Sequence, residues 1–323
     1  MRIERITVDE LYADLIQDYR IKGQTVEWAE RVWNVHLKDF FCGMRAANLG
    51  TNQITGYVEK RLSENSAKST VNRELALLRR AFSIGFDAEP QKVVRVPKFH
   101  KYIVSEKGNE RQGFVEDLQY RKLAEAAAGR LWLRGLLALG YTYGFRRAEL
   151  VGRFEKGQWK QEPMRCRQVD LLNRTVSLYS GETKNGEGRT VVLTEECLVL
   201  VTELRRGKQP DDYLFTWEDG SPLKDFRDVW DAITKAAGVP GLLLHDLRRS
   251  AVRNMERRGV PRKTARQISG HKTDAVYERY NITNEQDIRD AARKIEEGLI
   301  HSSFIVAQNQ GSEKIEPKDR KPS

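Results

Sequence analysis

The chain has 323 residues, which is long for one ordinary domain and predicts two domains with a tail. Lys and Arg exceed Asp and Glu by 56 − 46 = +10, an excess that fits a polyanionic partner but does not require one. Three scattered cysteines, without close Cys/His spacing, argue against a disulfide framework or a metal site, so we expect a reduced, cytoplasmic protein without metal. Neither a signal peptide nor a membrane-spanning run is predicted.

The first part of the chain carries apolar side chains at three- and four-residue steps, the period of amphipathic helices. Thr7, Thr25 and Thr51 each precede one such run, and a fourth run extends from Thr70 to Phe86. Four short helices of this kind are enough for a small bundle with a modest core. We therefore predict a helical first domain over residues 1–88.

Residues 89–113 break the helical pattern. Prolines and glycines punctuate this stretch, which also holds several basic side chains. It is predicted to be a basic linker, either a flexible tether or a strap that lies along a polyanion such as DNA. In the second case Arg95, Lys98 and Lys101 are the candidate contacts.

A second domain is predicted over residues 114–300, followed by a polar tail, 301–323, that we expect to be disordered. It opens with an amphipathic helix, 115–128, and a nearly uniformly apolar helix, 131–143, that should be buried. Short β-like runs separated by turn residues then predict a small antiparallel sheet. The predicted strands are Arg167–Leu171, Thr175–Ser180 and Arg189–Leu193, and the later helices are Glu195–Arg205, Leu223–Ala237, His245–Arg258, Pro261–Ser269, Thr273–Tyr280 and residues 285–297.

Positive charge is concentrated late in this domain. Between His245 and Asn281 ten Lys or Arg residues stand against four acids, a local excess of +6. Such a cluster is typical of phosphate binding, although a solvated basic face would have the same composition. His245 and Arg248 are three residues apart, hence on one helical face, at a helix start where free N–H groups favour an anion.

Other residues suited to phosphate chemistry lie elsewhere in the domain. Arg146 follows a glycine at the end of the buried helix, and Glu149 is placed to hold it by a charge-assisted contact. Lys184 lies at the tip of a predicted hairpin. His271 follows a glycine, and Tyr280 comes nine residues later. Taken singly, each has an ordinary interpretation as a surface charge or a packing residue.

The order and spacing of these residues together resemble the active-site set of the tyrosine recombinase, or phage integrase, family. The matching segments are YGFRRAEL, TKNGEGRTVVL, LLLHDLRRSAV and ISGHKTDAVYERYN. The resemblance covers residues 113 to 295. The helical N-terminal part is similar in architecture to the SAM-like core-binding domain of the family. The resemblance implies a mainly α fold with a small antiparallel sheet in the catalytic domain, arranged as a two-domain DNA clamp.

The resemblance also implies an activity: site-specific recombination or integration, as in mobile elements, by cutting and rejoining DNA through a 3′-phosphotyrosine on Tyr280. No metal, ATP or other cofactor is then expected. Arg146 and Arg248 suit neutralisation of the phosphate, because guanidinium is always charged and binds oxygens bidentately. Lys184 would be the general acid at the leaving oxygen. The partners would be double-stranded DNA and copies of the chain itself, as a tetramer on paired sites.

Several alternatives stay open at this point. His245 and His271 would both handle protons and phosphate contacts, and either could deprotonate the tyrosine. Tyr277 lies on the same helical face as Tyr280, but the nine-residue interval after His271 favours Tyr280. Residues 153–163 are an insertion relative to the family pattern and predict a surface loop, in contact with DNA, with another subunit, or with neither.

Two further alternatives concern the chain as a whole. The segment after Tyr280 could dock on another protomer or pack on its own domain. The protein could also be a catalytically silent DNA-binding protein of the same fold, or a topoisomerase using the same chemistry on a single duplex. All six expected catalytic positions are filled, which favours the enzyme, and the resemblance to integrases favours recombination.

Overall fold

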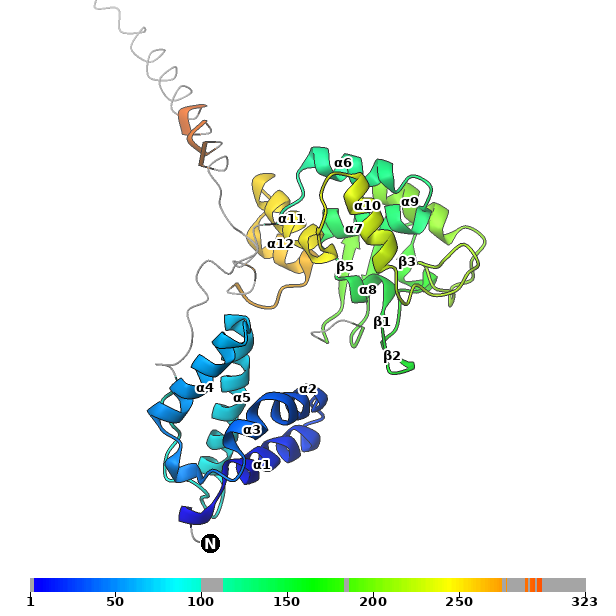
Figure 1. The fold of residues 1–323 in the computed structure, drawn as a ribbon. Coiled ribbons are helices and arrows are strands. Elements are labelled where there is room, and N and C mark those ends of the chain that lie inside the picture. Colours follow the sequence, from blue (N-terminus) through cyan, green and yellow to red (C-terminus); the bar gives the residue numbers. More distant parts are fainter. Residues whose placement is uncertain are drawn as a thin grey trace, which may run out of the picture. The chain divides into compact units, whose positions relative to one another are not determined.

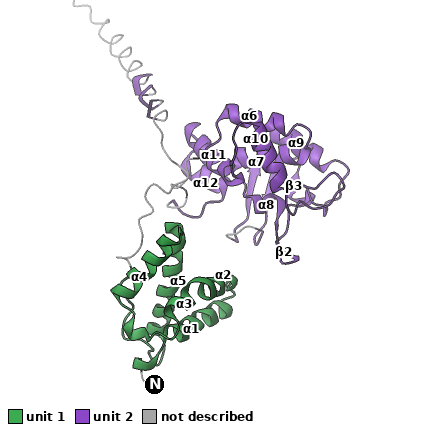
Figure 2. Cartoon of the chain, in the orientation of Figure 1, with its two compact units in different colours: residues 1–111 green, residues 112–323 purple. Residues whose placement is uncertain are grey.

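The computed structural model describes residues 3–99, 113–182 and 186–274, with Tyr277 and a few residues between 288 and 297. The chain divides into two compact units, residues 1–111 and 112–323 (Figure 2). Both are built mainly from helices, and small antiparallel sheets occur in the second (Figure 1). The predicted fold class is therefore confirmed.

Unit 1 is a helical bundle whose core forms where α1 packs against α5. Leu11 and Leu15 of α1 and Leu75, Leu78 and Phe82 of α5 are all buried there, at the three- and four-residue steps seen in the sequence. The helices are α1 Val8–Ile21, α2 Glu27–Val32, α3 Lys38–Phe41, α4 Thr51–Ser63 and α5 Lys68–Asp87, with short helical turns η1 Ile3–Arg5, η2 Trp33–Leu37 (a π-helix) and η3 Ala46–Asn48.

The first unit extends past the boundary expected from the sequence. Val93 and Phe99, inside the segment predicted to be a linker, are buried in the core of unit 1. The prolines and basic residues there suggested a tether, whereas these apolar side chains tie the segment to the bundle. Arg95 and Lys98 keep accessible surface, and Lys101 lies outside the described residues.

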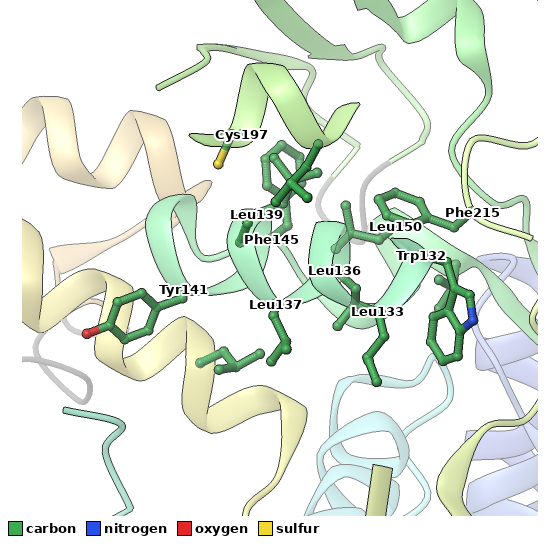
Figure 3. Packing of buried hydrophobic residues seen from close by; sticks show 14 of the residues in the cluster. Trp132, Leu133, Leu136, Leu137, Leu139, Tyr141, Phe145, Leu150, Cys197 and Phe215 are labelled. Atoms are coloured by element: carbon green, nitrogen blue, oxygen red, sulfur yellow. The ribbon is translucent and has the colours of Figure 1, made fainter. Parts of the chain in front are cut away.

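Unit 2 is organised around helix α7, Leu131–Tyr143, ten of whose thirteen residues are buried. Its apolar side chains leave in several directions (Figure 3), and it packs against both α9 and α11. The other helices are α6 Asp117–Ala126, α8 Arg147–Val151, α9 Glu195–Arg205, α10 Arg227–Ala236, α11 Leu244–Arg257 and α12 Arg262–Ser269, with a short turn η5 Cys166–Gln168. Although α7 is strongly apolar, no helix in the described part of the chain is long and apolar enough to cross a membrane.

The three predicted strands form one antiparallel sheet in the order β3–β4–β5. They are β3 Val169–Asp170, β4 Thr175–Leu178 and β5 Arg189–Val192. Val176 lies opposite Val169 on one side and Val191 on the other, and all three are buried. Alternate residues thus face the core, as the period-2 pattern of the sequence predicts.

The prediction of a surface loop over residues 153–163 is wrong. These residues form a hairpin of two strands, β1 Arg153–Glu155 and β2 Gln158–Gln161. Lys156 and Gly157 connect the strands with positive φ angles of 50° and 78°, as a tight two-residue turn requires. Phe154 and Trp159 contact each other across the strands with ring centroids 5.1 Å apart. The strands are too short to have produced a clear alternating pattern in the sequence.

Gly152, at the entrance to this hairpin, is predicted to tolerate no side chain. It has a φ of +72°, and a Cβ atom there would lie 2.7 Å from the Gln161 carbonyl oxygen and 2.8 Å from the nitrogen of Pro163. Gly152→Ala should therefore cost about 2 kcal/mol or more through strain and overlap. Gly157→Ala is the matched control, because its φ is +78° but a Cβ atom there would meet nothing within 4 Å; it should cost about 1 kcal/mol. Equal losses of melting temperature in the two variants would contradict this account of the hairpin.

Candidate active site

Arg146 is held in place by the first turn of α8. It is the N-cap residue of this helix, and its backbone N–H donates to Glu149 Oε2 at 2.8 Å. Its side chain donates to Glu149 Oε1 at 2.6 Å through Nη1, and to the Gly270 carbonyl at 3.2 Å through Nη2. Glu149 is buried, whereas the Arg146 side chain is 20% exposed. The carboxylate therefore anchors a guanidinium group that still reaches the surface.

A second arginine, Arg189 at the start of β5, binds the same carboxylate. Its Nη1 and Nη2 atoms donate to Glu149 Oε1 and Oε2 at 3.1 and 2.8 Å. Although burial raises the pKa of Glu149, Arg189 and Arg146 together hold it below its ordinary value. Arg189 was not predicted from the sequence, because its run has only the pattern of a strand. Nothing in that run points to Glu149, 40 residues earlier.

Arg248 on α11 is buried, with 1% of its surface exposed. Its Nη1 donates to the Gly144 carbonyl and, at 2.5 Å, to the Ser269 carbonyl. Its Nη2 lies 2.8 Å from Nε2 of His271. One guanidinium group thus links the end of α7, the end of α12 and the histidine that follows.

These contacts fix the tautomer of His271. A guanidinium group has donors only, so Nε2 of His271 must accept from Arg248 and carries no proton. Nδ1 then carries the proton and donates to Ser269 Oγ at 2.7 Å, which itself donates to the Ala265 carbonyl. Burial, with the charges of Arg248 and Arg146, lowers the pKa of His271 to about 2. The imidazole is neutral at physiological pH.

His245 lies in the first turn of α11, as the sequence predicts, and keeps an exposed surface. Asp246 caps the N-terminus of this helix: its carboxylate accepts a hydrogen bond from the Leu243 backbone N–H at 2.9 Å. Partial burial of the ring and the charge of Arg248 lower the pKa of His245. His245 therefore also favours its neutral form.

Stability should fall in acid because His271 cannot take a proton in the folded state. Its pKa lies below the ordinary 6.5, so the unfolded chain binds the proton more strongly. The stabilisation is complete above about pH 6.5 and is lost as pH falls, by up to about 1.4 kcal/mol per pH unit for this group. His271→Asn should flatten the dependence of melting temperature on pH between about pH 7.5 and pH 5. Parallel curves for variant and parent would contradict the assignment.

Two of the predicted catalytic residues, Lys184 and Tyr280, lie outside the described residues. Glu182, two residues before Lys184, is among the described residues. Gln161 of β2 donates to the Glu182 carbonyl at 2.7 Å, and Gln168 donates to the Glu182 carboxylate at 2.8 Å. The inserted hairpin is thus bonded to Glu182, two residues before Lys184.

Tyr277, the alternative nucleophile, is fully buried. It packs with Ala251, Val252, Met255 and Ala265 between α11 and α12. Its ring meets the His271 ring edge-on, with centroids 5.6 Å apart. These contacts fit a packing role for this tyrosine.

A cavity of about 740 Å³ adjoins Arg146 and Glu149. The inserted hairpin and Glu182 contribute to its lining, and so do basic side chains, among them Arg153, Lys160 and Arg165. Arg146 therefore borders an open space whose lining has more basic than acidic side chains, rather than a closed core.

Arg146 and Arg248 both donate to the turn that ends α12, and Arg248 also contacts His271. His245 lies three residues before Arg248 on α11. Guanidinium and imidazole groups anchored in this way are suited to bind a phosphodiester, as proteins that transfer DNA strands require. The profile of the phage integrase family matches residues 114–287. The chain belongs to this family, which confirms the resemblance predicted from the sequence and supports cleavage and rejoining of DNA in site-specific recombination.

Individual relatives have low sequence identity to this chain. A XerC-like tyrosine recombinase from Caldanaerobacter subterraneus subsp. tengcongensis is 24% identical over an alignment of 268 positions, which covers 72% of this chain and 67% of that protein. The Tn1549 transposon integrase, solved with transposon right end DNA, has a TM-score of 0.68 at 16% identity and covers 90% of this chain and 100% of that one. A lambda integrase tetramer bound to a Holliday junction has a TM-score of 0.65 at 16% identity, covering 86% and 78%. At these identities the structures share the fold.

Proposed function

We propose that this protein is a site-specific recombinase that cuts and rejoins DNA through a 3′-phosphotyrosine on Tyr280. The observation that carries the proposal is the joint anchoring of Arg146 and Arg248: both guanidinium groups bind the turn that ends α12, at Gly270 and Ser269. Two fixed positive charges can then share the nonbridging oxygens of one phosphate, where negative charge develops during transfer.

Arg146 has donors left for a phosphate. A guanidinium group has five N–H donors, and two side-chain bonds, to Glu149 and Gly270, occupy two of them within the described structure. This leaves 5 − 2 = 3 donors on a side chain that reaches the surface. Arg248 is buried, so its charge acts on the phosphate at short range in a medium of low dielectric constant.

We assign the proton transfer from Tyr280 to His245 rather than to His271. His271 already uses its Nε2 lone pair to accept from Arg248, and it must release that bond before it can take a proton. His245 has an exposed surface and a lowered pKa, so its neutral form is ready to act as a base. His271 then serves to hold Arg248.

Lys184 completes the proposed chemistry as the general acid that protonates the leaving 5′ oxygen. The phenolate of Tyr280 attacks the phosphorus, the P–O5′ bond breaks, and the new aryl phosphate ester conserves the energy of the phosphodiester. A second 5′-hydroxyl can therefore attack that ester and restore a DNA strand without ATP.

The proposed partners are double-stranded DNA and further copies of the chain. The similar lambda integrase structures are a dimer on a core site and a tetramer on a Holliday junction. We propose the same for this chain: a two-domain clamp on DNA and a tetramer on paired sites, acting in the cytoplasm, where DNA is accessible, in integration or excision of a mobile element.

The proposal is tested by covalent capture. Genomic DNA of the source organism is nicked lightly at random, so that cleavage near a nick releases a short strand and traps the enzyme. After incubation, the protein is denatured in detergent and DNA that stays attached is sequenced. Reproducible recovery of one short site supports the proposal, and that site is then made as a nicked duplex. Binding without any adduct would instead indicate a silent DNA-binding protein.

Recombination is separated from topoisomerase activity by two plasmid assays. A recombinase should exchange strands between two plasmids that carry the captured site and leave plasmids without it supercoiled. Relaxation of plasmids that lack the site, at the same enzyme concentration, would favour a topoisomerase.

A further inference from the structure

We infer that Arg189 is a positioning residue for catalysis: it fixes the direction in which Arg146 presents its guanidinium group, by holding Glu149 from the opposite side. This inference rests on the proposed function, in which Arg146 binds the scissile phosphate. The Arg189 side chain is only 5% exposed, and both of its Nη atoms donate to Glu149.

The four bonds to Glu149 are arranged symmetrically. Oε1 accepts from Nη1 of Arg146 at 2.6 Å and from Nη1 of Arg189 at 3.1 Å. Oε2 accepts from the backbone N–H of Arg146 at 2.8 Å and from Nη2 of Arg189 at 2.8 Å. Because Arg189 takes up both oxygens, the Arg146 side chain makes a single bond to the carboxylate. Its other donors are then directed elsewhere.

Arg189 is itself locked by the surrounding structure. Its guanidinium group lies over the ring of Phe145, the residue before Arg146, at 4.7 Å from the centroid. It also lies against Gly270, where a Cβ atom would be only 2.3 Å from Nη1 of Arg189. Gly270 is the residue whose carbonyl takes the second bond from Arg146. Arg189 therefore contacts both anchors of Arg146.

Removal of Arg189 should change the hydrogen bonds that Glu149 makes, while the rest of the site stays folded. The buried carboxylate would have one cation in place of two, and both its oxygens would turn to Arg146 in a bidentate pair. That pair competes with the phosphate for the same donors, so the transition state loses stabilisation while DNA binding elsewhere is unaffected. Lysine cannot replace arginine fully, because an ammonium group makes no planar, two-point contact.

The test uses the captured site as a nicked duplex and the full chain. Arg189→Gln should slow single-turnover cleavage about 10- to 100-fold, the usual effect of losing a residue that orients a functional group. The DNA dissociation constant should change less than about threefold, and Arg189→Lys should give an intermediate rate. Arg205→Gln is the control: Arg205 is a partly buried arginine of the same unit that donates to the Val169 carbonyl, away from Glu149. It should cleave at the parental rate.

Two measurements separate positioning of Arg146 from a general structural role. In the double variant Arg146→Ala, Arg189→Gln, the loss should equal that of Arg146→Ala alone, because the two residues act through one contact. A methylphosphonate at the scissile position removes the negative charge that Arg146 contacts. On that substrate Arg189→Gln should reduce the cleavage rate by a smaller factor. Additive losses, or a defect of unchanged size on methylphosphonate, would overturn the inference.

The role of Arg189 can be wrong while the proposed function is right, and the experiment distinguishes the two cases. If the parent chain forms no adduct with any DNA, the proposed function is wrong. If the parent forms the adduct and Arg189→Gln and Arg189→Lys both cleave at the parental rate, the function stands and the role of Arg189 is wrong. Should Arg189→Gln melt well below the parent, the cleavage rate of Arg189→Lys decides the question, because lysine keeps the buried charge.

Discussion

Replacing Tyr280 by phenylalanine should abolish covalent capture of DNA completely while leaving DNA binding intact. The substitution removes one oxygen atom, the nucleophile in the proposed mechanism, and the neighbouring Tyr277 is fully buried. The measurement is the amount of detergent-resistant protein–DNA adduct on the nicked duplex, together with the dissociation constant for the same duplex. The expected result is no adduct above background with binding within about twofold of the parent.

Tyr277→Phe is the matched control for this prediction, since it makes the same chemical change three residues earlier in the chain. Tyr277 is buried among Ala251, Met255 and Ala265, and the phenylalanine ring preserves that packing. This variant should still trap DNA. The assignment of the nucleophile is wrong if Tyr280→Phe forms adduct and Tyr277→Phe does not.

The second large effect is expected at Arg248. Arg248→Ala removes a buried guanidinium group and leaves the Gly144 and Ser269 carbonyls and the His271 ring without their donor. Breaking a buried charged contact of this kind costs about 3–5 kcal/mol. Loss of a preorganised charge at the phosphate should also slow cleavage on the order of 100- to 1,000-fold. Melting temperature and single-turnover cleavage measure the two effects separately.

Arg248→Lys separates stability from catalysis. Lysine keeps the positive charge but cannot reach three acceptors in one plane. We expect it to recover part of the stability of the parent and to remain strongly impaired in cleavage. An Arg248→Ala chain that melts and cleaves like the parent would contradict the role given to this residue.

The sequence predicted those parts of the site that depend on local geometry. The capping contact of Glu149 with Arg146 spans three residues within one helical turn, so spacing alone was sufficient to predict it. The placement of His245 at the start of α11 also follows from local signals. The buried helix α7 and the strands β3 to β5 were equally evident, because their apolar periods are regular.

The parts that escaped prediction depend on contacts between distant segments. Arg189 contacts Glu149 across 40 residues, and Arg248 contacts His271 across 23, with the whole of α12 between them. No periodicity encodes such pairs. The hairpin at 153–163 was missed for a different reason: its stability comes from Phe154 and Trp159 packing across two very short strands. Burial of Val93 was likewise hidden by neighbouring prolines and charges.

The most direct test of the central claim is to identify the amino acid that carries the DNA. The trapped adduct is digested with nuclease and trypsin, and the nucleotide-bearing peptide is sequenced by mass spectrometry. Arg279 stands between the two tyrosines, so trypsin separates residues 273–279, TDAVYER, from residues 280–289, YNITNEQDIR. The proposed mechanism predicts a nucleotide on Tyr280 in the second peptide. A nucleotide on Tyr277 in the first peptide, or on any residue outside both, would contradict it.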